Sequence, residues 1–177
     1  MQEARNIESE KWTGVEPEDG EVMTAPTDEW TAAALAHASV LLTLILGSAG
    51  GVGALFGPVV PLAIYLGYRE RSRFVAFHAL QSLVYQVAGV LLYVAFAAFM
   101  GSWVALAWTI SGLLSVVLIG LLLMPFALLA TLLMAFLLAG APFAWLGYGL
   151  YAAYQVYQGR NFHYWLIGEW LEQEVKL

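Results

Sequence analysis

Uncharged apolar segments separated by short breaks make up most of the chain after residue 29. The first segment, residues 30–46, contains mainly alanine, leucine, valine and threonine. A glycine-rich break follows, and a second apolar segment covers residues 53–68. A helix that crosses a bilayer needs about 20 apolar residues. The pattern therefore predicts two membrane-spanning helices, of which the second is short.

A much longer uncharged stretch covers residues 74–159. Its length permits two long helices with an apolar connection, or three crossings. We expect helices over residues 74–100 and 125–157, with a break at Gly101. Residues 103–124 are open to several interpretations: a re-entrant segment, an interfacial segment, a fifth crossing, or an extension of the neighbouring helices.

The positions of the basic residues predict how these helices are oriented. Arg69, Arg71 and Arg73 lie together between the second and third apolar segments. Because cytoplasmic loops of membrane proteins are enriched in lysine and arginine, this link is expected to be a cytoplasmic anchor. An even number of crossings returns Arg160 and Lys176 to the same side. The sequence thus favours an all-α, polytopic transmembrane bundle over residues 30–159, with four crossings rather than five and both termini on the cytoplasmic side of the inner membrane.

Residues 1–29 form an acidic arm, with nine acidic residues against Arg5 and Lys11. They lack apolar periodicity, so we expect this arm to be disordered. A docking arm with Trp12 and Val15 as anchors is the alternative. The acidic charge argues against a nucleic-acid partner.

Composition excludes a soluble domain, because 61% of the residues are hydrophobic and only 11% are charged, whereas about a quarter is usual. The chain has no cysteine, which excludes disulfides and thiolate chemistry. The long apolar stretch holds no carboxylate, lysine or arginine that could act as an acid, a base or a gate. We therefore expect no catalytic residue and no metal site, and a protein that is not an enzyme.

One helix face in the third segment carries polar side chains. His78, Gln81, Ser82 and Tyr85 follow the spacing i, i+3, i+4, i+7, and Gln86 lies beside them. An unpaired amide in hydrocarbon costs several kcal/mol, so this polar helix face must face other helices or a water-filled cavity. Bonding between helices is the favoured interpretation, and the lining of a polar path is the alternative.

Two histidines in the apolar segments suggest a contact between helices. If the first and third helices run in the same direction, His37 and His78 lie at comparable depth. Each is expected to hydrogen-bond a neighbouring helix. The alternative is that the pair ligates a haem or chlorophyll-type pigment through neutral imidazole nitrogens; otherwise no cofactor is expected.

Residues 160–177 interleave aromatic and charged side chains. This composition suits the headgroup layer of a membrane, where amphipathic rings settle. We expect a short interfacial tail, with a partner-binding motif as the alternative. The residues concerned are Arg160, His163, Tyr164, Trp165 and Trp170.

Several motifs together resemble an uncharacterised bacterial family of small four-helix membrane proteins. The most specific is the phenylalanine-histidine-alanine-x-glutamine element of residues 77–81, and the resemblance covers about residues 28–171. That family is distantly similar to the twenty-kilodalton channel subunit of the chloroplast inner-envelope import translocon. The resemblance implies a topology and no particular activity.

Three functions are open at this point. The leading hypothesis is an accessory or assembly subunit of a larger membrane complex, with the lipid bilayer and other membrane protein subunits as partners. A translocon-like channel or carrier that uses the polar helix face is the second. Pigment binding by the two histidines is the third.

Overall fold

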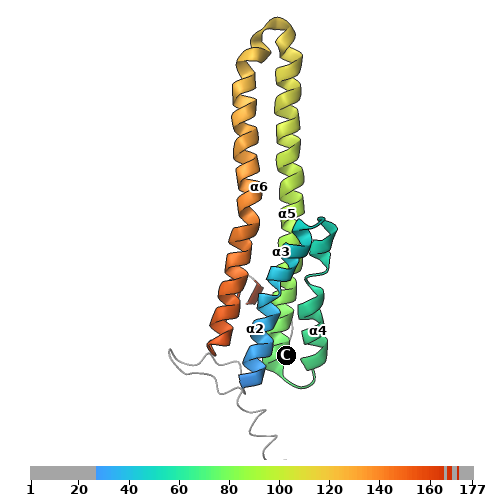
Figure 1. The fold of residues 1–177 in the computed structure, drawn as a ribbon, viewed down its shortest axis with the longest axis vertical. Helices are drawn as coiled ribbons and strands as arrows, with labels where there is room; N and C mark the ends of the chain where they lie inside the picture. Colours follow the sequence, from blue (N-terminus) through green and yellow to red (C-terminus); the bar gives the residue numbers. More distant parts are fainter. Residues whose placement is uncertain (1–26, 166, 169–170, 172–177) are drawn as a thin grey trace, which may run out of the picture.

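In a computed structural model that describes residues 27–165, 167–168 and 171, the chain is a helical bundle from which one long hairpin extends (Figure 1). The described part contains no strand, so the expected all-α class is confirmed. Most of the acidic arm, residues 1–26, lies outside the described residues. The elements are α2 (Thr27–Ala38), α3 (Val40–Ser48), η1 (Val52–Leu55), α4 (Val59–Tyr68), α5 (Arg73–Leu114), η2 (Ser115–Val117) and α6 (Ile119–Tyr157).

Three helical stretches in the described part are long and apolar enough to cross a membrane. They are Asp28–Ser48, which joins α2 to α3, Arg73–Val117 and Ile119–Tyr157. The first has 21 residues, close to the thickness of one bilayer. The second predicted helix corresponds to the shorter stretch Val52–Tyr68. The structure thus gives three candidate spans, and a fourth crossing by this shorter stretch stays a prediction.

Ser72 begins α5 and ties it to the start of α2. Its backbone is extended, and its hydroxyl accepts a hydrogen bond from the backbone N–H of Val75, the usual arrangement at a helix N-cap. The same hydroxyl donates to Oε2 of Glu29 at 2.7 Å. The link between α4 and α5 therefore lies beside the first turn of α2.

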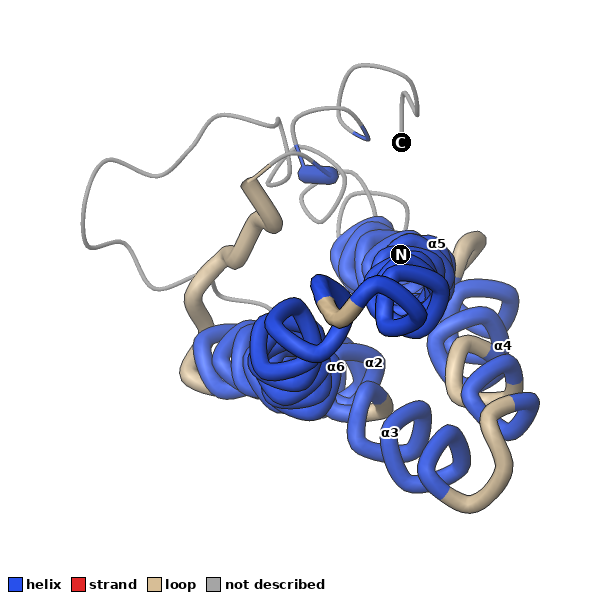
Figure 2. The backbone as a smooth tube through the Cα atoms, turned by 90° about the horizontal axis from the view of Figure 1, so that it is seen from above, coloured by secondary structure: helices blue, strands red, loops and turns tan. Residues whose placement is uncertain are grey.

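Small residues allow α2 to pack closely among its neighbours. Figure 2 views the bundle along the hairpin, and α2 contacts α4, α5 and α6. Ala33, Ala36 and Ala152 are fully buried. Beyond the end of α6, Gly159 has a φ of +78°, and a Cβ there would overlap the ring of Trp30. The last turn of α6 therefore also lies next to the start of α2.

Both long helices extend past their predicted ends. The predicted end at residue 100 is wrong, because α5 continues to Leu114, and α6 begins at Ile119 rather than at residue 125. Residues 103–124 are thus the two helix ends and the turn between them, not a separate segment. A helix break facing lipid would leave backbone groups without partners, which favours continuous helices there.

Pro142 is accommodated inside α6 because a side chain of the neighbouring helix bonds the carbonyl that the proline leaves free. Pro142 has no N–H, so the carbonyl of Leu138 loses its usual partner within the helix. The hydroxyl of Tyr93 on α5 donates to that carbonyl at 3.2 Å. A side chain from the neighbouring helix thus replaces the missing backbone bond.

Half of the hairpin lies beyond the other helices. Residues that bond between α2–α3 and α5 differ by 41 to 47 in number, so Ser48, the last residue of α3, is level with about residues 89–95 of α5. The bond from Tyr93 to Leu138 gives the matching level on α6. We call residues 92–138 the outer hairpin, and they extend past the short helices (Figure 1).

Candidate functional site

A buried polar cluster lies between α2, α3, α5 and the residues that follow α6. Almost all of its side chains are inaccessible to solvent, although they sit on strongly apolar helices. Each of them needs a hydrogen-bond partner within the protein. The members are His37, Ser39, Thr43, His78, Gln81, Ser82, Gln86 and Tyr164.

Gln86 is the centre of the first half of the cluster. Its Oε1 accepts from the hydroxyl of Thr43 at 2.7 Å, and its Nε2 donates to Ser39 at 2.8 Å and to Ser82 at 3.1 Å. Ser82 in turn donates to the backbone carbonyl of Ala36 at 2.6 Å. The amide thus has partners at both ends and joins α5 to α2 and α3.

The second half is a chain of three side chains. The Tyr164 hydroxyl lies 3.1 Å from Nδ1 of His37, and Nε2 of His37 lies 3.2 Å from Nδ1 of His78. The ring tautomers determine the direction of these bonds. Either Tyr164 donates to His37 and His37 donates to His78, or His78 donates to His37 and His37 donates to Tyr164. In both cases Nε2 of His78 is the end of the chain.

Two members of the cluster have polar atoms without a partner. Both polar atoms of the Gln81 amide are buried and form no hydrogen bond with a described residue, whereas the buried Nε2 of His78 lies near the side chain of Asn161 but outside hydrogen-bonding geometry. Gly168 lies against this amide, because a Cβ there would be 3.0 Å from Nε2 of Gln81. The chain after α6 therefore covers the part of the polar face that is not satisfied.

Tyr164 holds that covering segment in place. Its ring stacks on Tyr85, with centroids 4.1 Å apart and planes 4° apart, and only 2% of its surface is exposed. Burial, with Tyr85 and Tyr148 nearby, raises the pKa of Tyr164 above its ordinary value, so its hydroxyl stays protonated and can donate. The expectation that Tyr164 lies in the membrane interface is wrong: a tyrosine can bury its ring in a core whenever its hydroxyl finds a partner there.

The remaining predicted tail residues are arranged differently. Arg160 is exposed and donates to Oε1 of Gln155 at 3.1 Å. His163 is partly buried, with its ring 5.3 Å from that of Phe77. Trp165 is 77% exposed, as an anchor in a membrane interface would be. Trp170 lies outside the described residues.

The rest of the polar helix face faces inward, and the arginines face outward. Tyr85 is buried, and its hydroxyl donates to the backbone carbonyl of Trp145 on α6 at 2.6 Å. Arg69, Arg71 and Arg73 are exposed. The structure thus brings the histidines and the polar helix face into one cluster, separate from the arginines.

The direct contact between His37 and His78 bears on pigment binding. Their ring centroids are 5.4 Å apart and two ring nitrogens lie within hydrogen-bonding distance of each other. A macrocycle between two axial ligands would occupy that space. In this arrangement the two imidazole rings are hydrogen-bond partners of each other.

Sequence reasoning missed Ser39 and Thr43. Both hydroxyls point from the first span toward Gln86. A signal was available. Their i, i+4 spacing places both hydroxyls on one face of the first span, and this face could have been paired with the polar helix face of α5. Serine and threonine are common in membrane helices, which made this pattern look unremarkable.

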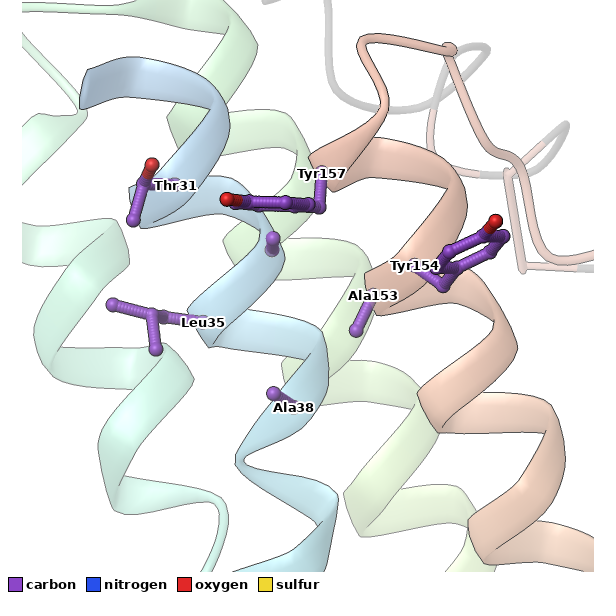
Figure 3. A pocket seen from close by; sticks show the side chains of 7 residues that line it. Thr31, Leu35, Ala38, Ala153, Tyr154 and Tyr157 are labelled. Atoms are coloured by element: carbon purple, nitrogen blue, oxygen red, sulfur yellow. The ribbon is translucent and has the colours of Figure 1, made fainter. Parts of the chain in front are cut away.

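A shallow groove of about 290 Å³ lies between α2 and α6 (Figure 3). Its lining is mostly apolar, with Leu35 and Ala38 on one side and Ala153 on the other, and the rings of Tyr154 and Tyr157 lie at its edge. Within the described residues there is no group of three or more histidine, aspartate or glutamate side chains that could hold a metal ion. Because its lining is mostly apolar, the groove suits an acyl chain more than a polar ligand.

The fold and the buried polar cluster define a small helical membrane protein whose polar side chains hold its helices together. Residues 28–171 match the magnetosome magnetite crystal formation protein family (MamF/MmsF), and the chain belongs to this family. Comparison with curated proteins and with solved structures gives no match. A bacterial membrane protein family was expected over these residues, and that expectation is confirmed; the similarity to an import translocon stays a prediction.

The first prediction concerns the attachment of the tail. Tyr164→Phe keeps the ring but leaves Nδ1 of His37 buried without a partner, so we expect a loss of about 1–3 kcal/mol in the free energy of unfolding. Tyr154→Phe is the matched control, because that hydroxyl only accepts a bond from exposed Gln158. Unfolding of both variants in detergent micelles is the measurement. Equal stability of the two variants would contradict the assigned role of Tyr164.

The second prediction compares two glutamines on the same helix. Gln86→Leu removes three hydrogen bonds and leaves the buried Thr43 hydroxyl without its partner, so we expect destabilisation of about 2–4 kcal/mol. Gln81→Leu removes an amide that has no partner among the described residues, so its effect is expected to be near zero or stabilising. The same unfolding assay checks both. A larger loss for Gln81→Leu than for Gln86→Leu would reverse the assignment.

Proposed function

We propose that this protein is a non-catalytic subunit of the magnetosome membrane that acts in magnetite crystal formation by contacting other membrane proteins. Membership of the magnetosome magnetite crystal formation family supports the membrane and the process. The buried polar cluster supports a structural role for the polar side chains of the chain, because they bond one another across α2, α5 and the tail.

The outer hairpin is the observation that carries the proposed contact with other proteins. At 1.5 Å per residue, the 42 residues of α5 extend about 63 Å and the 39 residues of α6 about 58 Å. The hydrocarbon core of a bilayer is about 30 Å thick. The hairpin is therefore twice as long as an upright crossing, whereas Asp28–Ser48 fits one bilayer.

The surface of the outer hairpin is apolar on every side. Leu113, Leu122 and Phe126 are 71%, 71% and 67% exposed. Each serine and threonine hydroxyl of the outer hairpin donates to a carbonyl of its own helix, as those of Ser102 and Thr131 do. Such a surface offers water few hydrogen-bonding groups apart from the exposed indole of Trp103. Cover by apolar helices of another subunit explains a hairpin of this length.

A channel along the polar helix face is the second candidate. One observation favours it: the Gln81 amide is buried without a partner, as a lining group of a closed path would be. The rest of that face is filled by Ser39, Thr43 and Tyr164, so a path would require the tail to move. Solute flux through proteoliposomes that Gln81→Leu abolishes would favour this candidate over the subunit role.

The role in crystal formation is tested in a magnetosome-forming host. We expect deletion of this chain to change the size or number of magnetite crystals, and the full chain to restore them. Crystals are measured by electron microscopy of whole cells. Complementation by Tyr154→Phe, which alters only an exposed hydroxyl, is the control. Unchanged crystals in the deletion strain would contradict the proposed process.

The contact with another subunit is tested by photo-crosslinking in native membranes. A photoreactive residue at Leu129 of the outer hairpin, which is 65% exposed, is compared with one at Leu35 of α2, which is 57% exposed. We expect a protein adduct at position 129 and adducts with lipid at position 35, identified by mass spectrometry. Lipid adducts alone at both positions would mean that the bilayer covers the hairpin and would remove the support for a subunit role.

A further inference from the structure

Three side chains at the contact between α5 and the chain after α6 have buried polar atoms that no described residue bonds. The atoms are Nε2 of His78, Oε1 and Nε2 of Gln81, and Oδ1 of Asn161. His78 and Gln81 are 0% exposed, so bulk solvent does not reach either side chain. A buried polar group without a hydrogen bond is strongly destabilising, so these four atoms need a partner.

The three side chains meet at one place. His78 and Gln81 are about one turn apart on the polar helix face of α5. Nε2 of His78 lies near the side chain of Asn161 but outside hydrogen-bonding geometry. A Cβ on Gly168 would be 3.0 Å from Nε2 of Gln81 and 2.8 Å from Cβ of His163. The segment that begins at Asn161 therefore also closes over the Gln81 amide.

The chemistry of the four atoms fits a water molecule. Oε1 of Gln81 and Oδ1 of Asn161 only accept hydrogen bonds, Nε2 of Gln81 only donates, and Nε2 of His78 does either according to its tautomer. Neither amide carries a charge, so the set suits a neutral molecule better than an ion. Buried waters typically form two to four hydrogen bonds with polar groups that otherwise lack a partner.

We propose that one buried water molecule binds between His78, Gln81 and Asn161 and joins α5 to the chain after α6. It donates its two hydrogens to the two amide oxygens and accepts from Nε2 of Gln81 and Nε2 of His78. All four atoms are then satisfied. The site is independent of the proposed subunit role, because it depends only on groups buried inside the bundle.

This water also determines the direction of the buried chain that begins at Tyr164. Both of its hydrogens go to amide oxygens, so Nε2 of His78 must donate to it. Nδ1 of His78 then accepts from Nε2 of His37, and Nδ1 of His37 accepts from the Tyr164 hydroxyl. Both histidines are therefore the tautomer with the proton on Nε2.

The small effect on stability expected of Gln81→Leu is compatible with this site. The leucine replaces the amide and displaces the water, so an apolar group takes the place of two polar partners together. Such a joint replacement is often nearly neutral for the free energy of unfolding. The variant therefore removes the water without unfolding the protein.

The test is solid-state NMR of the full chain in bilayers of deuterated lipid. We expect magnetisation transfer from water to the side-chain amide of Gln81 and to the Nε2 proton of His78. The amide of Gln86 is the matched control, because it is equally buried on the same helix but bonded by three hydroxyls. It is expected to receive no transfer.

Two outcomes of this measurement would overturn the proposal. The first is the absence of transfer at both Gln81 and His78. The second is equal transfer at Gln86, which would mean that water runs along the whole polar helix face, as the channel candidate requires, and not that it occupies one site.

Nitrogen chemical shifts and one variant complete the test. Both His37 and His78 are expected to show a protonated Nε2 and an unprotonated Nδ1; a proton on Nδ1 of His78 would overturn the proposal. Gln81→Leu is expected to abolish the transfer from water to His78, whereas Tyr154→Phe, which alters an exposed hydroxyl, is expected to leave it unchanged. Unchanged transfer to His78 in Gln81→Leu would show that the two residues share no water and would also overturn the proposal.

Discussion

Polar side chains on helices that face hydrocarbon must find partners inside the protein, and this requirement organises the base of the bundle. A hydrogen bond between membrane helices contributes only about 0.6 kcal/mol on average, whereas an unpaired polar group in hydrocarbon costs several. The bonds of Gln86 therefore add little to the free energy of folding, whereas leaving the same polar groups unpaired would cost much more. The alanines of α2 serve the same requirement, because the close approach of α5 lets Ser82 reach the carbonyl of Ala36.

The sequence predicts the α5 side chains of this cluster better than it predicts their partners. The spacing of His78, Gln81 and Ser82 identifies a helix face that must be buried, and the structure places all three at 0% exposure. The partners were harder to predict. Tyr164 has the same amphipathic ring whether it lies in a membrane interface or in a core, and its partner His37 is 127 positions away. Local pattern carries no information on that pairing.

Helix boundaries in the apolar stretch were predicted poorly for a physical reason. Glycine, serine and proline end helices in water because water bonds the freed backbone groups. Beside lipid those groups stay within the helix, so α5 continues through Gly101 and α6 through Pro142. The reversal is made instead at Leu118, which has a φ of +64°. Leucine is an unusual residue for that conformation, so the position of the turn had no clear signal in the sequence.

Tyr164 follows α2, α5 and α6 in the chain, which sets an order for biosynthesis. The ribosome completes α2, α5 and α6 before this tyrosine is made. During that interval Nδ1 of His37 lacks its only described side-chain partner. The polar cluster between the helices therefore stays incomplete until residue 164 has been translated.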